Sequence, residues 1–312
     1  MRRFKYSYLV FLVMFLASCQ TNDFPGEGGV FMRFYGSDAT DLGGSILELS
    51  DGGFAICGSQ TVEGQGEDML LLRVDADGYL LWRKTFGGVG TDKAEHMVEM
   101  PDGGFVLVGH KAIGSNGGND VFLVRTDAAG NQLWANEYGG GSNDFGQAIK
   151  VTPDGGFAIA GYTSSFGVGA SISNPNFMLL KVDASGNEQW LKAHGGLGDE
   201  KATAMLLSSD GGFILSGYSN SYASLNYEAQ VMKLDANGDS VWTYHGISNF
   251  HDEGRGIAKV NDSTYAWLGF TFRNNNDFDI VLQWVNDRGE EVPDRTWIFG
   301  GNDNDRALAV SY

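Results

Sequence analysis

An eight-residue motif that recurs about every fifty residues constrains the fold more than any other feature of this sequence. Its clearest copy is Asp102-Gly103-Gly104-Phe105-Val106-Leu107-Val108-Gly109. Other copies begin at Asp51, Asp154 and Asp210, and a divergent copy begins at Asp262. The starting Asp residues are separated by 51, 52, 56 and 52 positions. A fixed period of this length indicates stacked supersecondary units, so the fold can be predicted from one unit.

One such unit, residues 89–140, predicts four short strands. Apolar segments lie at 96–100, 105–108 and 121–125, and a fourth surrounds Trp134. Asp-Gly and Gly-Gly pairs between them are typical of tight turns. The second and third segments are continuously apolar, which indicates strands covered on both faces. A two-sheet sandwich would also bury strands but gives no reason for the period. The sequence therefore predicts an all-β fold, a β-propeller of four-stranded antiparallel blades.

The spacing predicts five complete blades in a propeller that covers residues 30–312. The repeats are placed at about 41–88, 89–140, 141–196, 197–247 and 248–301. Residues 31–36 align with a fourth strand and residues 302–312 with a first strand, so both ends are expected to contribute to a partial sixth blade. The sequence stops within the predicted first strand at 302–312. This is expected if the sequence is a fragment of a longer propeller, or if the propeller is open between its first and last blades.

Aromatic residues recur at two positions of the repeat. A Trp in the fourth strand and a Phe or Tyr that opens the second strand are interpreted as packing between blades. They are Trp82, Trp134, Trp190, Trp242 and Trp297, and Phe54, Phe105, Phe157, Phe213 and Tyr265. Cys57 falls inside an apolar strand and is interpreted as a small buried filler.

These motifs resemble the Asp-Gly-Gly-Phe/Tyr repeat β-propellers of bacterial secreted proteins and surface lipoproteins, over residues 31–312. The corner from Asp127 through Gly130 to Trp134 is distantly similar to that of quinoprotein-type (PQQ-like) propellers, with one residue fewer than is expected there. Sialidase Asp-boxes place the aromatic residue three positions after the Gly, whereas here it is four. The resemblance implies a propeller fold and supports neither enzyme activity.

The N-terminus predicts export and lipid anchoring. Residues 1–18 combine basic residues with a short apolar run, as in a secretory signal peptide. Leu16-Ala17-Ser18-Cys19 resembles a bacterial lipobox, which implies that Cys19 is the acylated first residue of the mature protein; the alternative is an ordinary signal peptide. Polar, Gly-rich residues 19–29 then form a flexible tether. The expected location is the cell envelope, at the outer membrane, with the periplasmic or surface side left open.

Composition argues against several partners and cofactors. The formal net charge is −18, and such an acidic surface repels nucleic acid and anionic lipid. The five histidines lack metal-ligand spacing, and His245 and His251 are expected to be solvated loop residues. No metal, cofactor or catalytic residue is predicted.

Binding is expected on the face that carries the longer loops between second and third strands. Two sets of residues stand out there. Acids near the start of each first strand could ring the channel mouth and hold a cation, although accepting local backbone N–H bonds is the favoured interpretation. These acids are Asp41, Asp92, Asp144, Glu200, Asp252 and Asp305. Loop aromatics suit stacking on sugars or peptides, and the ligand candidates are Tyr222, Tyr227, Phe272 and Phe166.

Two functions follow from these features. The preferred one is a lipid-anchored, non-catalytic binding or scaffold module for a glycan, a peptide or a partner protein. The alternative is an extracellular carbohydrate-active hydrolase or lyase that uses loop carboxylates. A pocket with two carboxyl groups about 5–9 Å apart would favour the enzyme.

Overall fold

The computed structural model describes residues 32–36, 38–112, 118–221, 226–246, 251–272, 277–301 and 303–309. Over these ranges the chain forms 21 strands and no helix, and none of it provides an apolar helix long enough to cross a membrane. The predicted signal peptide, the tether, Cys19 and Tyr222 lie outside the described residues.

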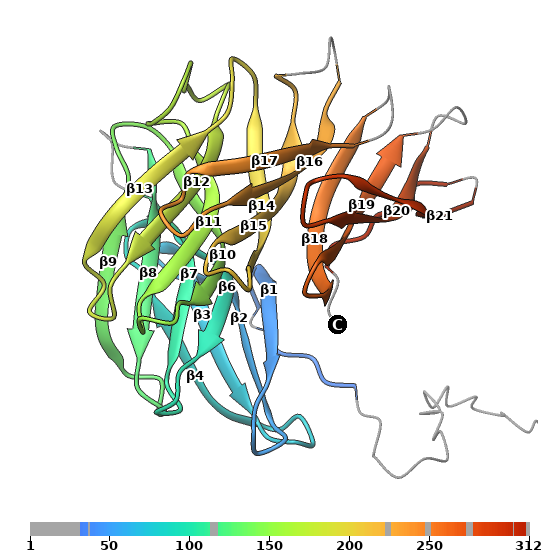
Figure 1. Cartoon of the computed structure of the whole chain (residues 1–312). Helices are drawn as coiled ribbons and strands as arrows, with labels where there is room; N and C mark the ends of the chain where they lie inside the picture. The colour runs from blue at the N-terminus through green and yellow to red at the C-terminus, as the bar shows by residue number, and fades with distance from the viewer. Residues whose placement is uncertain are drawn as a thin grey trace, which may run out of the picture.

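The strands form five sheets, each with four antiparallel strands in chain order (Figure 1). The first blade contains β1 (Asp41–Glu48), β2 (Phe54–Val62), β3 (Gly66–Val74) and β4 (Leu80–Phe86). The second contains β6 (Lys93–Glu99), β7 (Phe105–Ala112), β8 (Asn119–Thr126) and β9 (Gln132–Tyr138). The third contains β10 (Asp144–Val151), β11 (Phe157–Thr163), β12 (Asn176–Val182) and β13 (Glu188–His194).

The fourth blade contains β14 (Glu200–Leu207), β15 (Phe213–Ser219), β16 (Glu228–Leu234) and β17 (Ser240–His245). The fifth contains β18 (Asp252–Asn261), β19 (Thr264–Phe272), β20 (Phe278–Asn286) and β21 (Glu291–Phe299). The short β5 (Gly90–Thr91) pairs in parallel with β3, so the link to the second blade is tied to the first. The predicted five four-stranded units are therefore confirmed.

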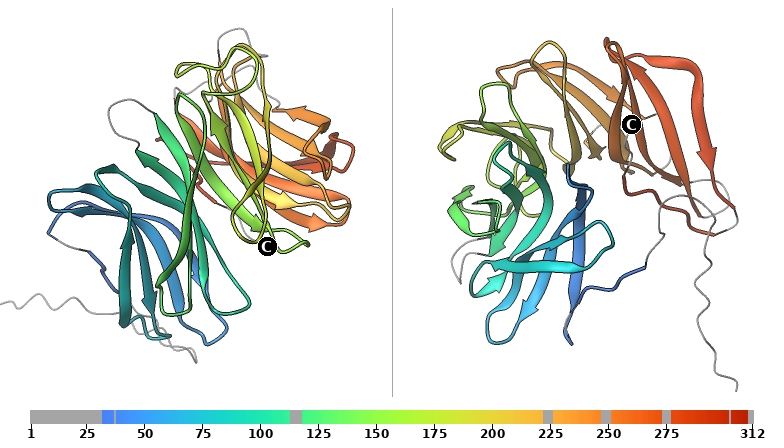
Figure 2. Two further views of the ribbon diagram at one scale, coloured as in Figure 1. Left: turned by 90° about the vertical axis from the view of Figure 1, so that its left-hand side faces the viewer. Right: turned by 90° about the horizontal axis from the view of Figure 1, so that it is seen from below.

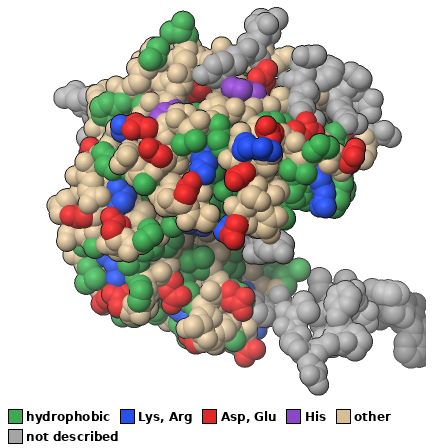
Figure 3. Space-filling model, in the orientation of Figure 1, with side chains coloured by type: hydrophobic (Ala, Val, Ile, Leu, Met, Phe, Trp, Pro, Cys, Tyr) green, Lys and Arg blue, Asp and Glu red, His purple; other side chains and the backbone are tan. Residues whose placement is uncertain are grey.

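The blades follow one another around an axis as an open arc (Figure 2). First strands lie innermost, and β1, β6, β10, β14 and β18 contact one another in that order. The first and fifth blades stand at the two ends of the arc, with an opening between them in the right-hand view of Figure 2. Over the face shown in Figure 3, acidic and basic side chains are interspersed and do not form a patch of one sign.

The recurring Asp of the motif ties the first turn of a blade to its third strand. Asp102 accepts a hydrogen bond from the Gly104 N–H at 3.1 Å and pairs with Arg125 of β8 at 2.5 Å. Asp154 pairs in the same way with Lys181 at 2.9 Å, and Asp210 pairs with Lys233 at 2.5 Å. In the divergent fifth copy Asp262 instead pairs with Lys259, three residues earlier. The motif thus links strands that lie more than twenty residues apart.

The core lies between blades, as the recurring aromatics predict. The rings of Trp82, Trp134 and Trp190 each meet the Phe of the next blade edge-on, at 6.3 Å between centroids. Trp82 also covers Gly130, where φ is +76° and a Cβ would lie 2.7 Å from the indole. Glycine is therefore required in that turn for both backbone conformation and space. Cys57 is fully buried, and burial raises the pKa of its thiol to about 12, in agreement with its interpretation as a filler.

The partial sixth blade is not formed as strands by the described residues. Residues 32–36 and 303–309 have no regular secondary structure, although alignment with the repeats predicts strands there. A fourth strand pairs with a third, and a first strand pairs with a second. Within the described ranges, no second or third strand pairs with these two segments.

Candidate ligand-binding face

The acids near the start of the first strands accept backbone hydrogen bonds. Asp92, Asp144, Glu200 and Asp305 each accept the N–H of the Gly four residues earlier, at 2.8, 2.7, 3.1 and 3.1 Å. Asp252 is buried and Asp41 is half-buried. Within the described ranges, no three His, Cys, Asp or Glu side chains form a group that could hold a metal ion. The contacts are those of a repeated structural cap.

The predicted loop aromatics have different surroundings. Phe272 is half-buried and packs edge-on against Phe278 at 5.1 Å. Phe166 is 37% exposed and lies in the loop before β12, close to Gly140. Tyr227 is half-buried and belongs to a polar network. Among the described aromatic candidates, Tyr227 is therefore the one whose ring is part of a polar network with charged side chains.

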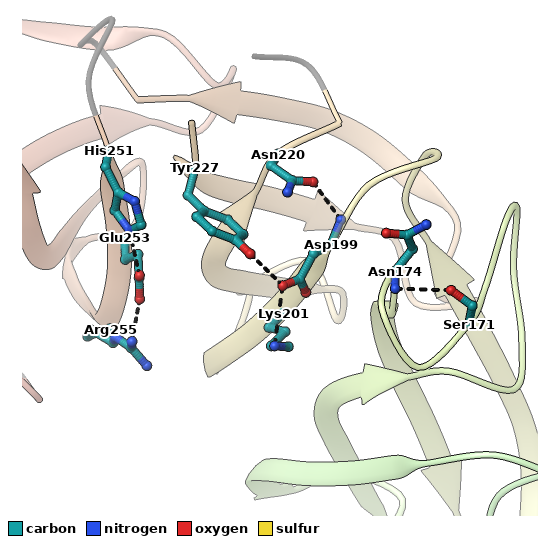
Figure 4. A network of polar contacts seen from close by, with 9 residues as sticks. All are labelled: Ser171, Asn174, Asp199, Lys201, Asn220, Tyr227, His251, Glu253 and Arg255. Carbon is teal, nitrogen blue, oxygen red and sulfur yellow. Dashed lines mark hydrogen bonds and ion pairs between the residues drawn. The ribbon is translucent and has the colours of Figure 1, made fainter. Parts of the chain in front are cut away.

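The network around Asp199 joins residues of the fourth blade (Figure 4). The Tyr227 hydroxyl, just before β16, donates to Asp199 Oδ2 at 2.8 Å. Lys201 of β14 lies 3.3 Å from the same oxygen, and the Asp199 N–H donates to Asn220 Oδ1 at 2.6 Å. Asp199 Oδ1 is buried and has no hydrogen-bond partner among the residues that the structure describes. One acceptor oxygen of this network is therefore left for another donor.

A second network on β18 lies beside it. The carboxylate of Glu253 contacts His251 Nε2 at 2.7 Å and accepts a hydrogen bond from Arg255. Burial opposes ionisation of Glu253, but the His251 hydrogen bond and the Arg255 charge outweigh burial and hold its pKa below the ordinary value. The expectation of a solvated His251 is wrong, because its ring is half-buried and lies 5.0 Å from the Tyr227 ring.

Rings and cations alternate across these blades and form what we call the cation–ring belt: Tyr162, Lys201, Tyr218, Arg255 and Phe270. Lys201 Nζ lies 5.2 Å from the Tyr162 ring and 5.9 Å from the Tyr218 ring. The Arg255 guanidinium lies 5.4 Å from both the Tyr218 and the Phe270 rings. The cations come from first strands and the rings from the residue after the last Gly of the motif, so neighbouring blades interleave them.

Sequence reasoning missed Asp199, Lys201, Glu253 and Arg255. The weak signal that could have found them is the alternation of half-buried polar side chains along first strands, at the second and fourth positions. Tyr162 and Tyr218, which were not among the predicted ligand candidates, are both half-buried.

The belt and the Asp199 network together provide hydrogen-bond donors, cations and one buried acceptor. Burial raises the pKa of Tyr162 to about 12, and burial together with the Asp199 hydrogen bond raises that of Tyr227 to about 12. Both phenols therefore remain protonated donors at neutral pH. The Lys201 and Arg255 side chains are about one-third exposed and remain accessible from solution. Such an arrangement can stack on a flat ligand and hydrogen-bond its polar edges.

Comparison with known proteins supports the fold and does not assign a family. No family profile matches the chain. The chain is 35% identical over 205 residues to the regulatory protein FlaEY of Caulobacter vibrioides, a match that covers 63% of this chain and 19% of that protein. The chain thus corresponds to about a fifth of the length of this relative.

Solved structures with a similar fold share little sequence with the chain. The WD40 domain of Neurospora crassa Pan2 has a TM-score of 0.54 at 10% identity, and the match covers 87% of this chain and 69% of that one. Cobalt-substituted Synechocystis apocarotenoid oxygenase (ACO) has a TM-score of 0.50 at 9% identity, over 82% of this chain and 60% of that one. WD40 domains are β-propellers. The likeness therefore supports a propeller-type arrangement of blades.

Proposed function

We propose that this protein is a non-catalytic binding or scaffold module, and that the cation–ring belt and the adjoining Asp199 network contact its ligand. The proposed ligands are a glycan, a peptide or a partner protein. The observation that carries the proposal is the alternation of rings and cations beside a buried, unpartnered Asp199 oxygen. These groups are held on strands of neighbouring blades, so they are positioned before a ligand arrives.

Glu253 in the second network is not suited to the acid role in glycoside hydrolysis. A glycosidase acid needs a carboxyl group whose pKa is raised, so that it holds a proton near neutral pH. Glu253 has a lowered pKa and is held by His251 and Arg255. This carboxylate is therefore suited to orient its neighbours rather than to donate a proton.

The proposed location completes this function. We propose that Cys19 carries the lipid anchor and that the propeller is presented from the outer membrane on the 19–29 tether. Multiple acyl chains bind a membrane stably, since each buried methylene adds about 0.8 kcal/mol. The module would then collect its ligand at the cell envelope.

Glycan and peptide arrays with the full chain test the proposal, followed by titration of the best probe. Tyr227→Ala should weaken binding at least about fivefold, because stacking on one ring contributes about 1–3 kcal/mol. Tyr227→Phe keeps the ring but removes the donor to Asp199, so the two variants separate stacking from hydrogen bonding.

Tyr79→Ala is the matched control. Tyr79 is an exposed tyrosine next to the turn after β3, whereas Tyr227 precedes the corresponding strand β16, so the two lie at opposite ends of a blade. Binding by this control should equal that of the unaltered chain. If Tyr227→Ala binds every probe normally and only lowers the melting temperature, the Asp199 network and the belt beside it are packing and the proposed function fails.

A further inference from the structure

Two cations lie next to the Tyr218 ring, and each of them already has a carboxylate partner (Figure 4). Lys201 Nζ lies 3.3 Å from Asp199 Oδ2. The Arg255 guanidinium donates to Glu253. The same two cations lie 5.9 and 5.4 Å from the centroid of the Tyr218 ring. We call these five residues the Tyr218 cluster. Its four charges cancel, although the whole chain has a formal net charge of −18.

The Tyr218 cluster does not repeat from blade to blade. Arg255 is the residue that a β-bulge leaves unpaired in its first strand. The bulge residues of the other first strands are Gly44, Glu95, Gln147 and Thr203. The residues that pack one blade on the next do recur, as the Trp of the fourth strands shows. Packing between blades therefore does not require these charge pairs, and they can serve a ligand. β-Bulges commonly re-aim a side chain next to a functional site.

Two hydrogen-bonding atoms of the cluster are buried without a partner among the described residues. One is an acceptor, Asp199 Oδ1, and the other is a donor, Arg255 Nε. A buried polar atom without a partner destabilises the free protein, and a ligand that pairs with the atom recovers this loss. The cluster thus matches a ligand that offers both a donor and an acceptor and brings no net charge.

We infer that the Tyr218 cluster binds a neutral sugar residue of a glycan, an inference that rests on the binding function proposed above. A sugar hydroxyl both donates and accepts, so the hydroxyls of a neutral glycan can pair with Asp199 Oδ1 and Arg255 Nε. The apolar face of a sugar ring stacks on tyrosine. An acidic sugar would instead bring a carboxylate beside Asp199 and Glu253, where both cations are already paired.

Calorimetric titration of the full chain with two sets of hexasaccharides tests this inference. The neutral set is built from glucose, galactose, mannose, xylose or N-acetylglucosamine, and the acidic set from galacturonate or mannuronate. At least one neutral hexasaccharide should bind about tenfold more tightly than every acidic one. Its Kd should change less than about twofold between low salt and about 0.5 M NaCl, because the complex forms without pairing of net charges.

Asp199→Asn should reverse part of this preference. It leaves Lys201 without its carboxylate partner, so the neutral hexasaccharide should bind about fivefold or more weakly and the acidic set more tightly. Asp183→Asn is the matched control, because it makes the same charge change in the turn between β12 and β13, at the opposite end of a blade. Asn286 accepts the corresponding turn hydrogen bonds in the fifth blade, so the fold accepts Asn there and binding should be unchanged.

The outcomes separate this inference from the proposed function. Tighter binding of an acidic hexasaccharide, or of an array peptide alone, with weakening by Tyr227→Ala would overturn the neutral-sugar inference and leave the binding function in place. Equal effects of Asp199→Asn and Asp183→Asn on the neutral hexasaccharide would also overturn it. If no hexasaccharide and no array peptide binds, both fail. Should Asp199→Asn not fold, the preference and salt dependence of the unaltered chain decide the question.

Discussion

Replacing Asp120 with Asn is expected to stabilise the fold at neutral pH and to remove part of its pH dependence. Asp120 is the second residue of β8, is 8% exposed, and has one oxygen without a hydrogen-bond partner among the described residues. It lies close to Asp144, and a Cβ at Gly139 would collide with both carboxyl groups. Burial, and then the charge of Asp144, raise the pKa of Asp120 to about 6. In the third blade Asn176 occupies the same place beside Glu200, so the fold already accepts an amide there.

The linkage between proton binding and folding determines the sign and the size of the expected change in the free energy of unfolding. Because folding raises the pKa of Asp120, its protonated form stabilises the folded chain. This stabilisation is fully present below pH 3.8 and is lost as the pH rises through about 6. Raising this pKa from 3.8 to about 6 corresponds to at most about 3 kcal/mol at neutral pH. The Asn amide must itself find hydrogen bonds, so we expect a net gain of about 1 kcal/mol.

Urea unfolding at pH 4 and pH 7.5 measures this effect. Asp120→Asn should be more stable than the unaltered chain at pH 7.5, and the difference should be much smaller at pH 4. The reverse change, Asn176→Asp, places a second carboxyl group beside Glu200 and should destabilise the chain at pH 7.5 far more than at pH 4. The reasoning is refuted if the stability difference for Asp120→Asn does not change with pH.

Two further predictions concern packing between blades and the anchor. Trp134→Ala removes a ring packed between blades and should lower the free energy of unfolding by about 3–5 kcal/mol in urea titrations; Trp297→Ala should cost less than half as much, because that ring is half exposed, and equal losses would contradict the packing described. Cys19→Ala should release the protein from membranes and abolish palmitate labelling, and unchanged labelling would rule out the proposed anchor.

The repeat in the sequence was sufficient to predict the blades. Burial on both faces and turn formation depend on residues a few positions apart, so the run Phe105–Val108 and the Asp-Gly pairs carry that information locally. The same period predicted that Trp134 and its equivalents pack between blades, since one aromatic per unit must meet the next unit in a stack.

The tertiary structure alone decided which polar groups meet and whether the ring closes. The Tyr227 hydroxyl and Asp199 are 28 residues apart, and Lys201 meets Tyr162 of the preceding blade. Such pairs depend on strand register and on the rotation between blades, neither of which is encoded by a local pattern. For the same reason His251 was wrongly expected in solvent. The arrangement of the five described blades in an arc was also decided at this level, because the rotation from one blade to the next is not encoded by a local pattern.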